Sequence, residues 1–422
     1  MTSEEIRDHV WQMGKQARAA AHALTKLSSP QKKAILLAMA DAVAAKEAKI
    51  IEANEQDLAA AAEAGLAEAM KDRLRLDRDR IAAMAKGIRD VAELRDPSGE
   101  TIREWTRPNG LLIRKQRTPI GVIGIIYESR PNVTADAAVL CFKTGNATIL
   151  RGGKEAIHSN RAIAAALQEG GAAAGLPEHS IQLIPFTDRE SVRHLAEMDA
   201  YLDLIIPRGG AGLIEAVVSM ARMPVIKHYD GVCHTYVDKK ADLDMAEAIA
   251  INAKVQKPSV CNAMETLLIH RDAAPRFAPR IAENLSAKRV ELRGDEAFRE
   301  LAGIDGVVPA VESDWSTEYL DYILSVKVVD DLDAAIEHIN HYGSHHSDCI
   351  VTDDEEAAAR FQLEVDSACV FWNSSTRFAD GAEFGFGAEI GISTDKLHAR
   401  GPMALEELCS YKYLVVGTGQ VK

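Results

Sequence analysis

The sequence is poor in aromatic residues, in positive charge and in long apolar runs, and each shortage excludes a class of protein. Aromatic residues make up only 5% of the chain, while alanine is abundant in its first half, which favours helices over a β-sandwich. The net charge of −14 argues against a nucleic-acid partner, because phosphate backbones are bound by clustered lysine and arginine. A few local cations can still hold one phosphorylated small molecule.

Signals for membranes, export and cross-linking are also missing. The longest apolar run, near residues 120–127, is far shorter than the roughly 20 residues that a membrane-spanning helix needs. The first residues, MTSEEIRDHV, lack the basic and apolar regions of a secretion signal. The six cysteines are scattered without a CxxC pair, which disfavours a zinc site or a disulfide framework and is typical of a reducing compartment. We therefore expect a cytoplasmic protein without a membrane partner.

The first part of the chain has helical patterns. A chain of 422 residues is expected to form two or three domains. In residues 1–95, Thr2 and Glu5 are spaced as a capping box, and the Ser29-Pro30 pair starts a second helix. Pro108-Asn109-Gly110 then predicts a turn between two extended segments. An exposed hairpin of this kind often pairs with another subunit.

From residue 120 onwards, short apolar strands alternate with helical stretches. This alternation predicts a parallel, doubly wound sheet, and a second alternation over residues 265–370 predicts a second α/β domain. The expected strands of the first sheet are 122–127, 147–150, 181–184 and 202–206.

The strongest chemical signal is KPSVCNAMETLL, residues 257–268, in which Cys261 follows a Pro-Ser turn. Lys254 and Lys257 lie just upstream, and cations near a thiol stabilise the thiolate that nucleophilic catalysis requires. A single cysteine among apolar neighbours is more often a buried small hydrophobe, and this alternative stays open. The other five cysteines lack a polar, turn-bounded setting, and we interpret them as structural.

Two glycine-rich turns follow expected strands. In IIPRGGAGLIEAV, Gly209-Gly210 precedes a helix, so backbone amides there can approach a pyrophosphate; a turn without a ligand is about equally consistent with this pattern. In ATILRGGKEAIHSN, Arg151, Lys154 and His158 favour a 2′-phosphate on a dinucleotide ribose, although Lys154 can also be a solvated loop residue.

Four histidines occur in HINHYGSHHSDCIVTDD, residues 338–354. Zinc binding is conceivable, but His338 and His341 are separated by helical spacing and no carboxylate-histidine motif accompanies them. We expect no metal site.

Several strings together resemble one family along the whole chain. With the cysteine string, the strings TPIGVIGIIYESRPNVTADAA, AIEHINHYGSHHSDCI, FWNSSTRFADGAEFGFGAEIGIST and ARGPMALEELCSYKYLVVGTGQ resemble the glutamate-5-semialdehyde dehydrogenase family of the aldehyde dehydrogenase superfamily. The resemblance implies an aldehyde dehydrogenase-like α/β fold with a Rossmann-like NADP-binding domain, an α/β catalytic domain and a small oligomerisation β-flap. The expected domains are 1–98 with 119–239 for the cofactor, 240–400 for catalysis, and 99–118 with 401–422 for the flap.

The resemblance also assigns site residues. Cys261 falls on the family's nucleophile, and Gly209-Gly210 on the turn that faces the pyrophosphate. Lys154, accompanied by Arg151, falls on the lysine that contacts the adenosine ribose, and Glu318 on the glutamate that holds the nicotinamide ribose.

Three departures from the wider superfamily refine the expectation. His228-Tyr229-Asp230-Gly231 lacks the glutamate that activates water in aldehyde-oxidising members, so a thioester should not hydrolyse quickly. Ser129 stands at the usual oxyanion asparagine, so the oxyanion should rely on backbone N–H groups near Cys261 and Asn262. Ile157 replaces a glutamate that would repel a 2′-phosphate, which favours NADPH over NADH.

The reaction that the resemblance implies is reduction of L-glutamyl 5-phosphate to glutamate 5-semialdehyde and phosphate in proline synthesis, with NADP(H) as cofactor and a thioester on Cys261. Two alternatives stay open: an aldehyde dehydrogenase that makes the free acid, and an inactive scaffold that binds the preceding glutamate kinase. We expect a homo-oligomer. Substrate-binding candidates, whose arginines can equally form structural salt bridges, are Arg130, Asn132, Asn373, Ser374, Ser375 and Arg377.

Overall fold

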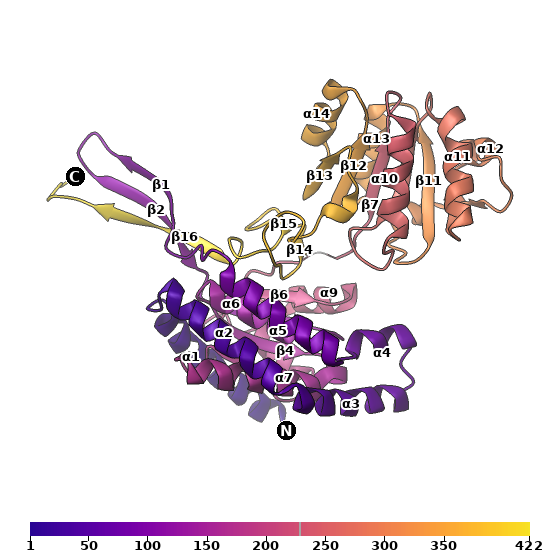
Figure 1. The fold of residues 1–422 in the computed structure, drawn as a ribbon. Helices are drawn as coiled ribbons and strands as arrows, with labels where there is room; N and C mark the ends of the chain where they lie inside the picture. The colour runs from indigo at the N-terminus through magenta and orange to yellow at the C-terminus, as the bar shows by residue number, and fades with distance from the viewer. Residues whose placement is uncertain (228) are drawn as a thin grey trace. The chain divides into compact units, whose positions relative to one another are not determined.

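The computed structural model describes residues 1–227 and 229–422, apart from the side chain of Ala69, and the chain divides into two compact units (Figure 1). Each unit holds a parallel β-sheet with helices, which confirms the expected α/β class. The first unit comprises Met1–Lys227, Gly385–Gly391 and Met403–Lys422, and the second comprises His228–Phe384 and Ile392–Pro402.

Five helices open the first unit. The predicted capping box at the start of α1 is confirmed, because the Glu5 N–H donates to Thr2 Oγ1 (3.2 Å) and the Thr2 N–H donates to Glu5 Oε2 (2.8 Å). The cap of α2 is Ser28 rather than Ser29, since the Ser28 N–H donates to Gln31 Oε1 at 2.9 Å. The helices are α1 (Ser3–Leu24), α2 (Ser29–Ala45), α3 (Glu47–Glu63), α4 (Glu68–Leu74) and α5 (Arg78–Glu93).

A four-stranded parallel sheet follows, in the order β5-β4-β3-β6. The strand order reverses at β3, and in parallel sheets ligands bind beyond the carboxyl ends of the strands at such a point. The expected strand over 122–127 matches β3 from end to end, whereas β6 begins at Leu204 rather than at residue 202. The elements are β3 (Val122–Tyr127), α6 (Val133–Lys143), β4 (Ala147–Gly152), the 3₁₀ turn η1 (Lys154–Ala156), α7 (Ile157–Ala173), β5 (Ile181–Leu183), α8 (Glu190–Ala196), β6 (Leu204–Arg208) and α9 (Ala211–Met220).

The predicted hairpin is confirmed and gains a third strand from the end of the chain. Strands β1 (Thr101–Thr106) and β2 (Leu112–Pro119) pair antiparallel around a turn in which Gly110 has a φ of 86°. Strand β16 (Cys409–Val416) pairs antiparallel with β2, and the three strands lie side by side in Figure 1.

The second unit is built on a seven-stranded parallel sheet in the order β10-β9-β11-β8-β7-β12-β13. The division between the units falls at Lys227 rather than at the expected residue 239, because β7 pairs with β8 and β12 of this second sheet. The strands are β7 (Cys233–Val237), β8 (Met264–His270), β9 (Glu291–Gly294), β10 (Val308–Pro309), β11 (Ile323–Val329), β12 (Ser347–Val351) and β13 (Cys369–Trp372), with β14 (Ile392–Ser393) and β15 (Gly401–Pro402) forming a separate pair.

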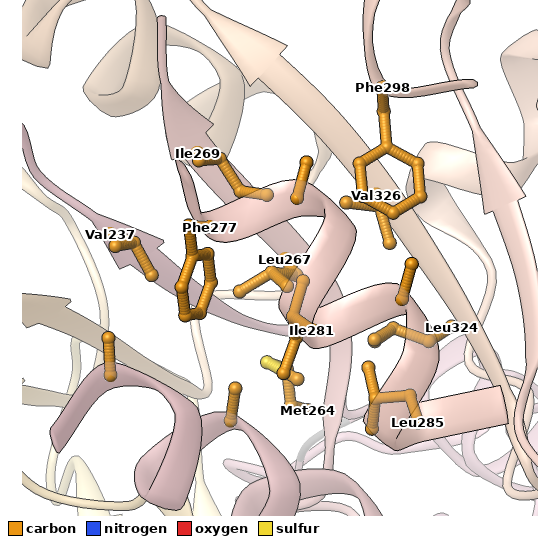
Figure 2. Close-up of a cluster of buried hydrophobic side chains, with 14 of the residues drawn as sticks. Val237, Met264, Leu267, Ile269, Phe277, Ile281, Leu285, Phe298, Leu324 and Val326 are labelled. Atoms are coloured by element: carbon orange, nitrogen blue, oxygen red, sulfur yellow. The ribbon is translucent and has the colours of Figure 1, made fainter. Parts of the chain in front are cut away.

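Helices cover both faces of this sheet. On one face, Phe277 and Ile281 of α11 pack against Leu267 and Ile269 of β8 (Figure 2), and burial of each such side chain contributes roughly 1.5–3 kcal/mol. On the other face, Leu268 packs with residues of α13 and α14. Strand β8 is therefore fixed between two cores. The helical elements are α10 (Leu243–Val255), α11 (Ala274–Ala287), α12 (Glu296–Leu301), η2 (Glu312–Ser316), α13 (Leu332–Tyr342), α14 (Glu355–Glu364) and η3 (Thr376–Phe378).

Among the described residues, no helix combines the length and the apolar character that crossing a membrane requires.

Candidate active site

Cys261 lies in the turn between α10 and the amino end of β8. All six cysteines are described, and Cys261 is the one that is not buried. Burial raises the pKa of Cys141, Cys349 and Cys409 to about 12, and it raises the pKa of Cys233 as well. These thiols stay protonated near neutral pH, so Cys261 is the accessible candidate for a nucleophile.

The main chain of Cys261 is held from the β7 side. Gly231 packs so closely against it that a Cβ on Gly231 would lie 2.0 Å from the Cys261 carbonyl oxygen and 2.6 Å from its Cα. The Cys233 thiol donates to the same carbonyl oxygen at 3.2 Å. Only glycine leaves room for this approach, and its position was not apparent from the sequence.

Asn262 uses its side chain to hold the neighbouring loop. Its Nδ2 donates to the carbonyl oxygens of Ala379 (3.0 Å) and Arg377 (3.3 Å), and its Oδ1 accepts from the Arg377 guanidinium. In contrast, the backbone N–H groups of Cys261 and Asn262 donate to no acceptor in the described part of the chain. The geometry therefore agrees with an oxyanion held by backbone amides rather than by the Asn262 side chain.

The cation placed next to the Cys261–Asn262 segment is Arg377, whose guanidinium donates to Asn262 Oδ1, rather than Lys254. Burial lowers the pKa of the Arg377 guanidinium, while attraction to a Cys261 thiolate acts in the opposite direction. Lys254 is instead turned to Glu265, with 2.6 Å between Nζ and Oε2, and Lys257 is exposed. Arg377 lies on a segment far along the chain, so its contact with Asn262 could not be predicted from the sequence.

Glu318 lies close to the nucleophile within the same unit. Its carboxylate is half-buried, burial raises its pKa, and the Gly231 backbone amide acts on this pKa in the opposite direction. Because Gly231 also packs against Cys261, the structure brings together the predicted nucleophile and the predicted ribose ligand.

The FWNSSTRF residues have mainly structural contacts. The Asn373 amide accepts from the Thr352 N–H (2.9 Å) and donates to the Thr352 carbonyl (3.0 Å). Ser375 is buried and caps η3, and Ser374 is half-buried. Substrate binding by these residues stays a prediction.

In the first unit, the Gly209-Gly210 turn holds an anionic oxygen. The Gly210 N–H, at the start of α9, donates to Glu128 Oε2 at 3.0 Å. A Cβ on Gly209 would lie 2.4 Å from the same oxygen, so a larger residue there would displace the Glu128 carboxylate. The turn thus has the donor and the space that a pyrophosphate needs.

The two cations expected near the cofactor ribose differ in availability. The Arg151 guanidinium is buried and donates to the carbonyl oxygens of Thr187 (2.9 Å) and Gly152 (3.0 Å), and burial lowers its pKa. These contacts do not support the expected contact between Arg151 and a 2′-phosphate. Lys154 is exposed at the end of β4 and pairs with no carboxylate among the residues described.

The segment after β3 carries the remaining predicted residues. Ser129 adopts a left-handed conformation (φ 48°), and its N–H donates to Glu155 Oε1 at 2.6 Å. Arg130 is exposed, and Asn132 is exposed and donates to Asp136 Oδ2 at 2.8 Å. These residues lie at the carboxyl edge of the first sheet, the edge that also carries Lys154 and Gly210.

The histidine-rich segment forms a packed cluster. The buried His338 ring contacts the rings of Trp315, Tyr342 and His234, and burial lowers its pKa to about 2. Outside the undescribed His228, no group of three or more potential ligands is placed to hold a metal ion. His228 also heads the string expected to replace the water-activating glutamate, so that position lies outside the described residues.

Comparison with known proteins places this geometry in context. Residues 2–299 match the aldehyde dehydrogenase family. The chain is 54% identical over 417 residues to the gamma-glutamyl phosphate reductases of Geobacter metallireducens and Geotalea daltonii, covering 99% of this chain and of each relative. The chain belongs to the gamma-glutamyl phosphate reductase family. It is therefore an oxidoreductase of a superfamily that uses a nicotinamide cofactor.

The fold agrees with that of a solved member of the gamma-glutamyl phosphate reductase family. The crystal structure of the Thermotoga maritima reductase superposes with a TM-score of 0.96 at 46% identity, covering 98% of this chain and 99% of that chain. The aldehyde dehydrogenase-like fold expected from the sequence is thus confirmed.

Proposed function

We propose that this chain is a cytoplasmic, NADPH-dependent gamma-glutamyl phosphate reductase that makes glutamate 5-semialdehyde for proline synthesis. The observation that carries the proposal is an accessible Cys261 flanked by backbone amides without acceptors, in a chain 54% identical to proteins named for this reaction. The scaffold alternative does not require an exposed thiol beside such amides, and the acid-forming dehydrogenase, which would use the same thiol, requires a water-activating glutamate that the string at residues 228–231 lacks.

Cys261 reacts as a thiolate in the proposed reaction, and the Arg377 guanidinium lies on the neighbouring loop, where it donates to Asn262 Oδ1. The sulfur attacks the acyl carbon of L-glutamyl 5-phosphate, a C–S bond forms, and the C–O bond to the departing phosphate breaks. The backbone N–H groups of Cys261 and Asn262 stabilise the oxyanion that forms on the acyl oxygen. A bound NADPH supplies the hydride that reduces the resulting thioester. Release of the aldehyde returns the thiolate to Cys261.

The cofactor residues that fit are Lys154, Gly210 and Glu318. The Gly210 N–H already donates to a carboxylate oxygen, the Lys154 ammonium has no carboxylate partner in the described chain, and Glu318 is held beside Cys261 through Gly231. Lys154 would bind a ribose or its 2′-phosphate. The Gly210 N–H would donate to the pyrophosphate. Glu318 would accept hydrogen bonds from the nicotinamide ribose.

Replacement of Cys261 by alanine tests the covalent step. We expect Cys261→Ala to lose semialdehyde formation by more than about 1000-fold while still binding NADPH, because the thiol takes part only in the chemistry. The matched control is Cys141→Ala, a fully buried cysteine of α6, which should keep its turnover. Mass spectrometry of the wild type mixed with acyl phosphate should find the added acyl group on Cys261. Normal turnover by Cys261→Ala would refute the proposal.

The partner reaction distinguishes a reductase from an acid-forming dehydrogenase. In the reverse direction, semialdehyde oxidation should require inorganic phosphate, since a slowly hydrolysed thioester needs phosphate to release it. Strong oxidation without phosphate would favour the aldehyde dehydrogenase alternative.

Preference for NADPH is tested at Lys154. Lys154→Ala should raise the KM for NADPH about tenfold and change the KM for NADH much less, because one charge-assisted contact to the 2′-phosphate is lost. The control is Lys26→Ala, another exposed lysine without an ion-pair partner among the described residues. Equal catalytic efficiency of the wild type with both cofactors would contradict the proposed preference.

Assembly into a homo-oligomer through the β1-β2-β16 sheet is part of the same proposal. Tyr411, Tyr413 and Val415 of β16 are each about half exposed (49%, 54% and 57%), which is unusual for apolar strand residues. Light scattering should find an assembly that Tyr413→Lys weakens. A wild-type monomer at micromolar concentration would rule it out. Contact with the preceding glutamate kinase stays a prediction.

A further inference from the structure

A buried ion pair lies directly behind the nucleophile turn. Lys254 of α10 and Glu265 of β8 approach to 2.6 Å between Nζ and Oε2, and their side chains are 0% and 1% exposed. Glu265 follows Cys261 by four positions on the segment that leads into β8. The pair therefore connects the helix before the nucleophile to the strand after it.

The second carboxylate oxygen of Glu265 holds the turn that carries Glu318. Glu265 Oε1 accepts from the Leu320 backbone N–H at 3.2 Å. Leu320 has a φ of 55°, a left-handed conformation that is unfavourable for a leucine and persists only where its surroundings impose it. The hydrogen bond from Leu320 to Glu265 is such a constraint, and Glu318 precedes it by two residues.

Glu318 in turn is connected to the nucleophile. The Gly231 backbone amide acts to lower the pKa of the Glu318 carboxyl, and Gly231 packs against the Cys261 main chain. The contacts thus run from Lys254 to Glu265, from there to the Glu318 turn, and through Gly231 to Cys261.

Stability alone gives little reason for this pair. Removing two charges from water costs several kcal/mol per ion, and apolar replacements of buried ion pairs are often as stable or more stable. Burial here raises the pKa of Glu265 to about 7 and lowers the pKa of Lys254, so both charged forms are held at a cost.

We infer that Glu265 is a positioning residue, whose Oε1 fixes the Glu318 turn for the nicotinamide ribose, and that Lys254 compensates its buried charge. The inference rests on the proposed function, because it gives the pair the task of placing a cofactor ligand. Neither residue touches the substrate or the reacting atoms in this account.

Two double variants separate positioning from simple stability. Lys254→Met with Glu265→Gln removes both charges but keeps an oxygen that accepts from Leu320, whereas Lys254→Met with Glu265→Leu removes the acceptor as well. Neither variant leaves a lone buried charge, so both should fold. We expect the Leu variant to raise the KM for NADPH about tenfold and to slow iodoacetamide alkylation of Cys261, with the Gln variant close to wild type.

A mutant cycle with Glu318→Gln tests whether Glu265 affects NADPH binding through Glu318. If Glu265 acts through Glu318, adding Lys254→Met and Glu265→Leu to Glu318→Gln should raise the KM for NADPH no further. The matched control is the buried pair Lys32–Asp96 of the first unit, with 2.9 Å between Nζ and Oδ2 and side chains 3% exposed. Lys32→Met with Asp96→Asn should lower thermal stability at most and leave both readouts unchanged.

The possible results are distinguishable. A folded Leu variant with wild-type KM for NADPH and wild-type alkylation rate would overturn the inference. A further tenfold rise in the KM for NADPH when the Leu variant is combined with Glu318→Gln would also overturn it. If the Leu variant does not fold, a Gln variant with a tenfold higher KM would also overturn it, because the retained acceptor should suffice. Failure of the proposed function itself is recognised separately, by a wild type that does not use NADPH or by an active Cys261→Ala.

Discussion

Gly231→Ala adds one methyl group at the point where the site is packed most tightly. The new Cβ would lie 2.0 Å from the Cys261 carbonyl oxygen and 2.6 Å from its carbonyl carbon, and these are backbone atoms that cannot rotate away. The Cys261 turn must therefore move by roughly 1 Å to reach normal contact distance. Overpacking of this size costs about 1–3 kcal/mol of unfolding free energy, whereas a 1 Å misplacement can cost about 100-fold in rate.

The assay compares stability with reactivity. We expect Gly231→Ala to remain folded in a thermal melt, to lose about 100-fold in kcat/KM and to react more slowly with iodoacetamide at Cys261. The control is Gly87→Ala in α5, where an added Cβ meets nothing within 4 Å; it should stabilise the protein by roughly 1 kcal/mol and leave activity intact. Wild-type alkylation and turnover in Gly231→Ala would show that the close packing does not position the nucleophile.

Two further predictions concern charge. Glu128→Gln removes a carboxylate from the Gly210 N–H, so NADPH should bind about threefold to tenfold more tightly by fluorescence titration; weaker binding would contradict competition at this turn. His338 has its pKa lowered to about 2, below its unfolded value, so its contribution is complete above about pH 6.5 and is lost as the pH falls. Between pH 6.5 and 5 the wild type should lose about 2 kcal/mol more unfolding free energy than His338→Gln, and parallel denaturation profiles would disprove this.

Local features were predictable where neighbouring residues alone decide them. The capping box at Thr2 depends on two residues three positions apart, and the strand over 122–127 is a continuous apolar run, so both could be predicted from the sequence. Cys261 was found through its turn-bounded string, and its being the one unburied cysteine agrees with that choice. These features involve short sequence separations, which a linear pattern records.

Contacts between residues far apart in the sequence decided the features that could not be predicted. The sequence placed two lysines near Cys261, yet Lys254 is paired with Glu265, and the cation that contacts the neighbouring Asn262 is Arg377 on a distant loop. Arg151 follows a strand, as a phosphate ligand would, but the fold buries its guanidinium against carbonyl oxygens.

By itself, then, the sequence determined the α/β class and the family and predicted Cys261 as the nucleophile, because strand and helix periods and an uninterrupted motif are properties of neighbouring residues. Only the tertiary structure decided which sheet β7 joins, that Arg377 contacts Asn262 and that Gly231 packs against the Cys261 main chain. Those facts depend on segments far apart in the chain meeting in space, and hydrophobic burial and backbone pairing bring them together without leaving a local signature.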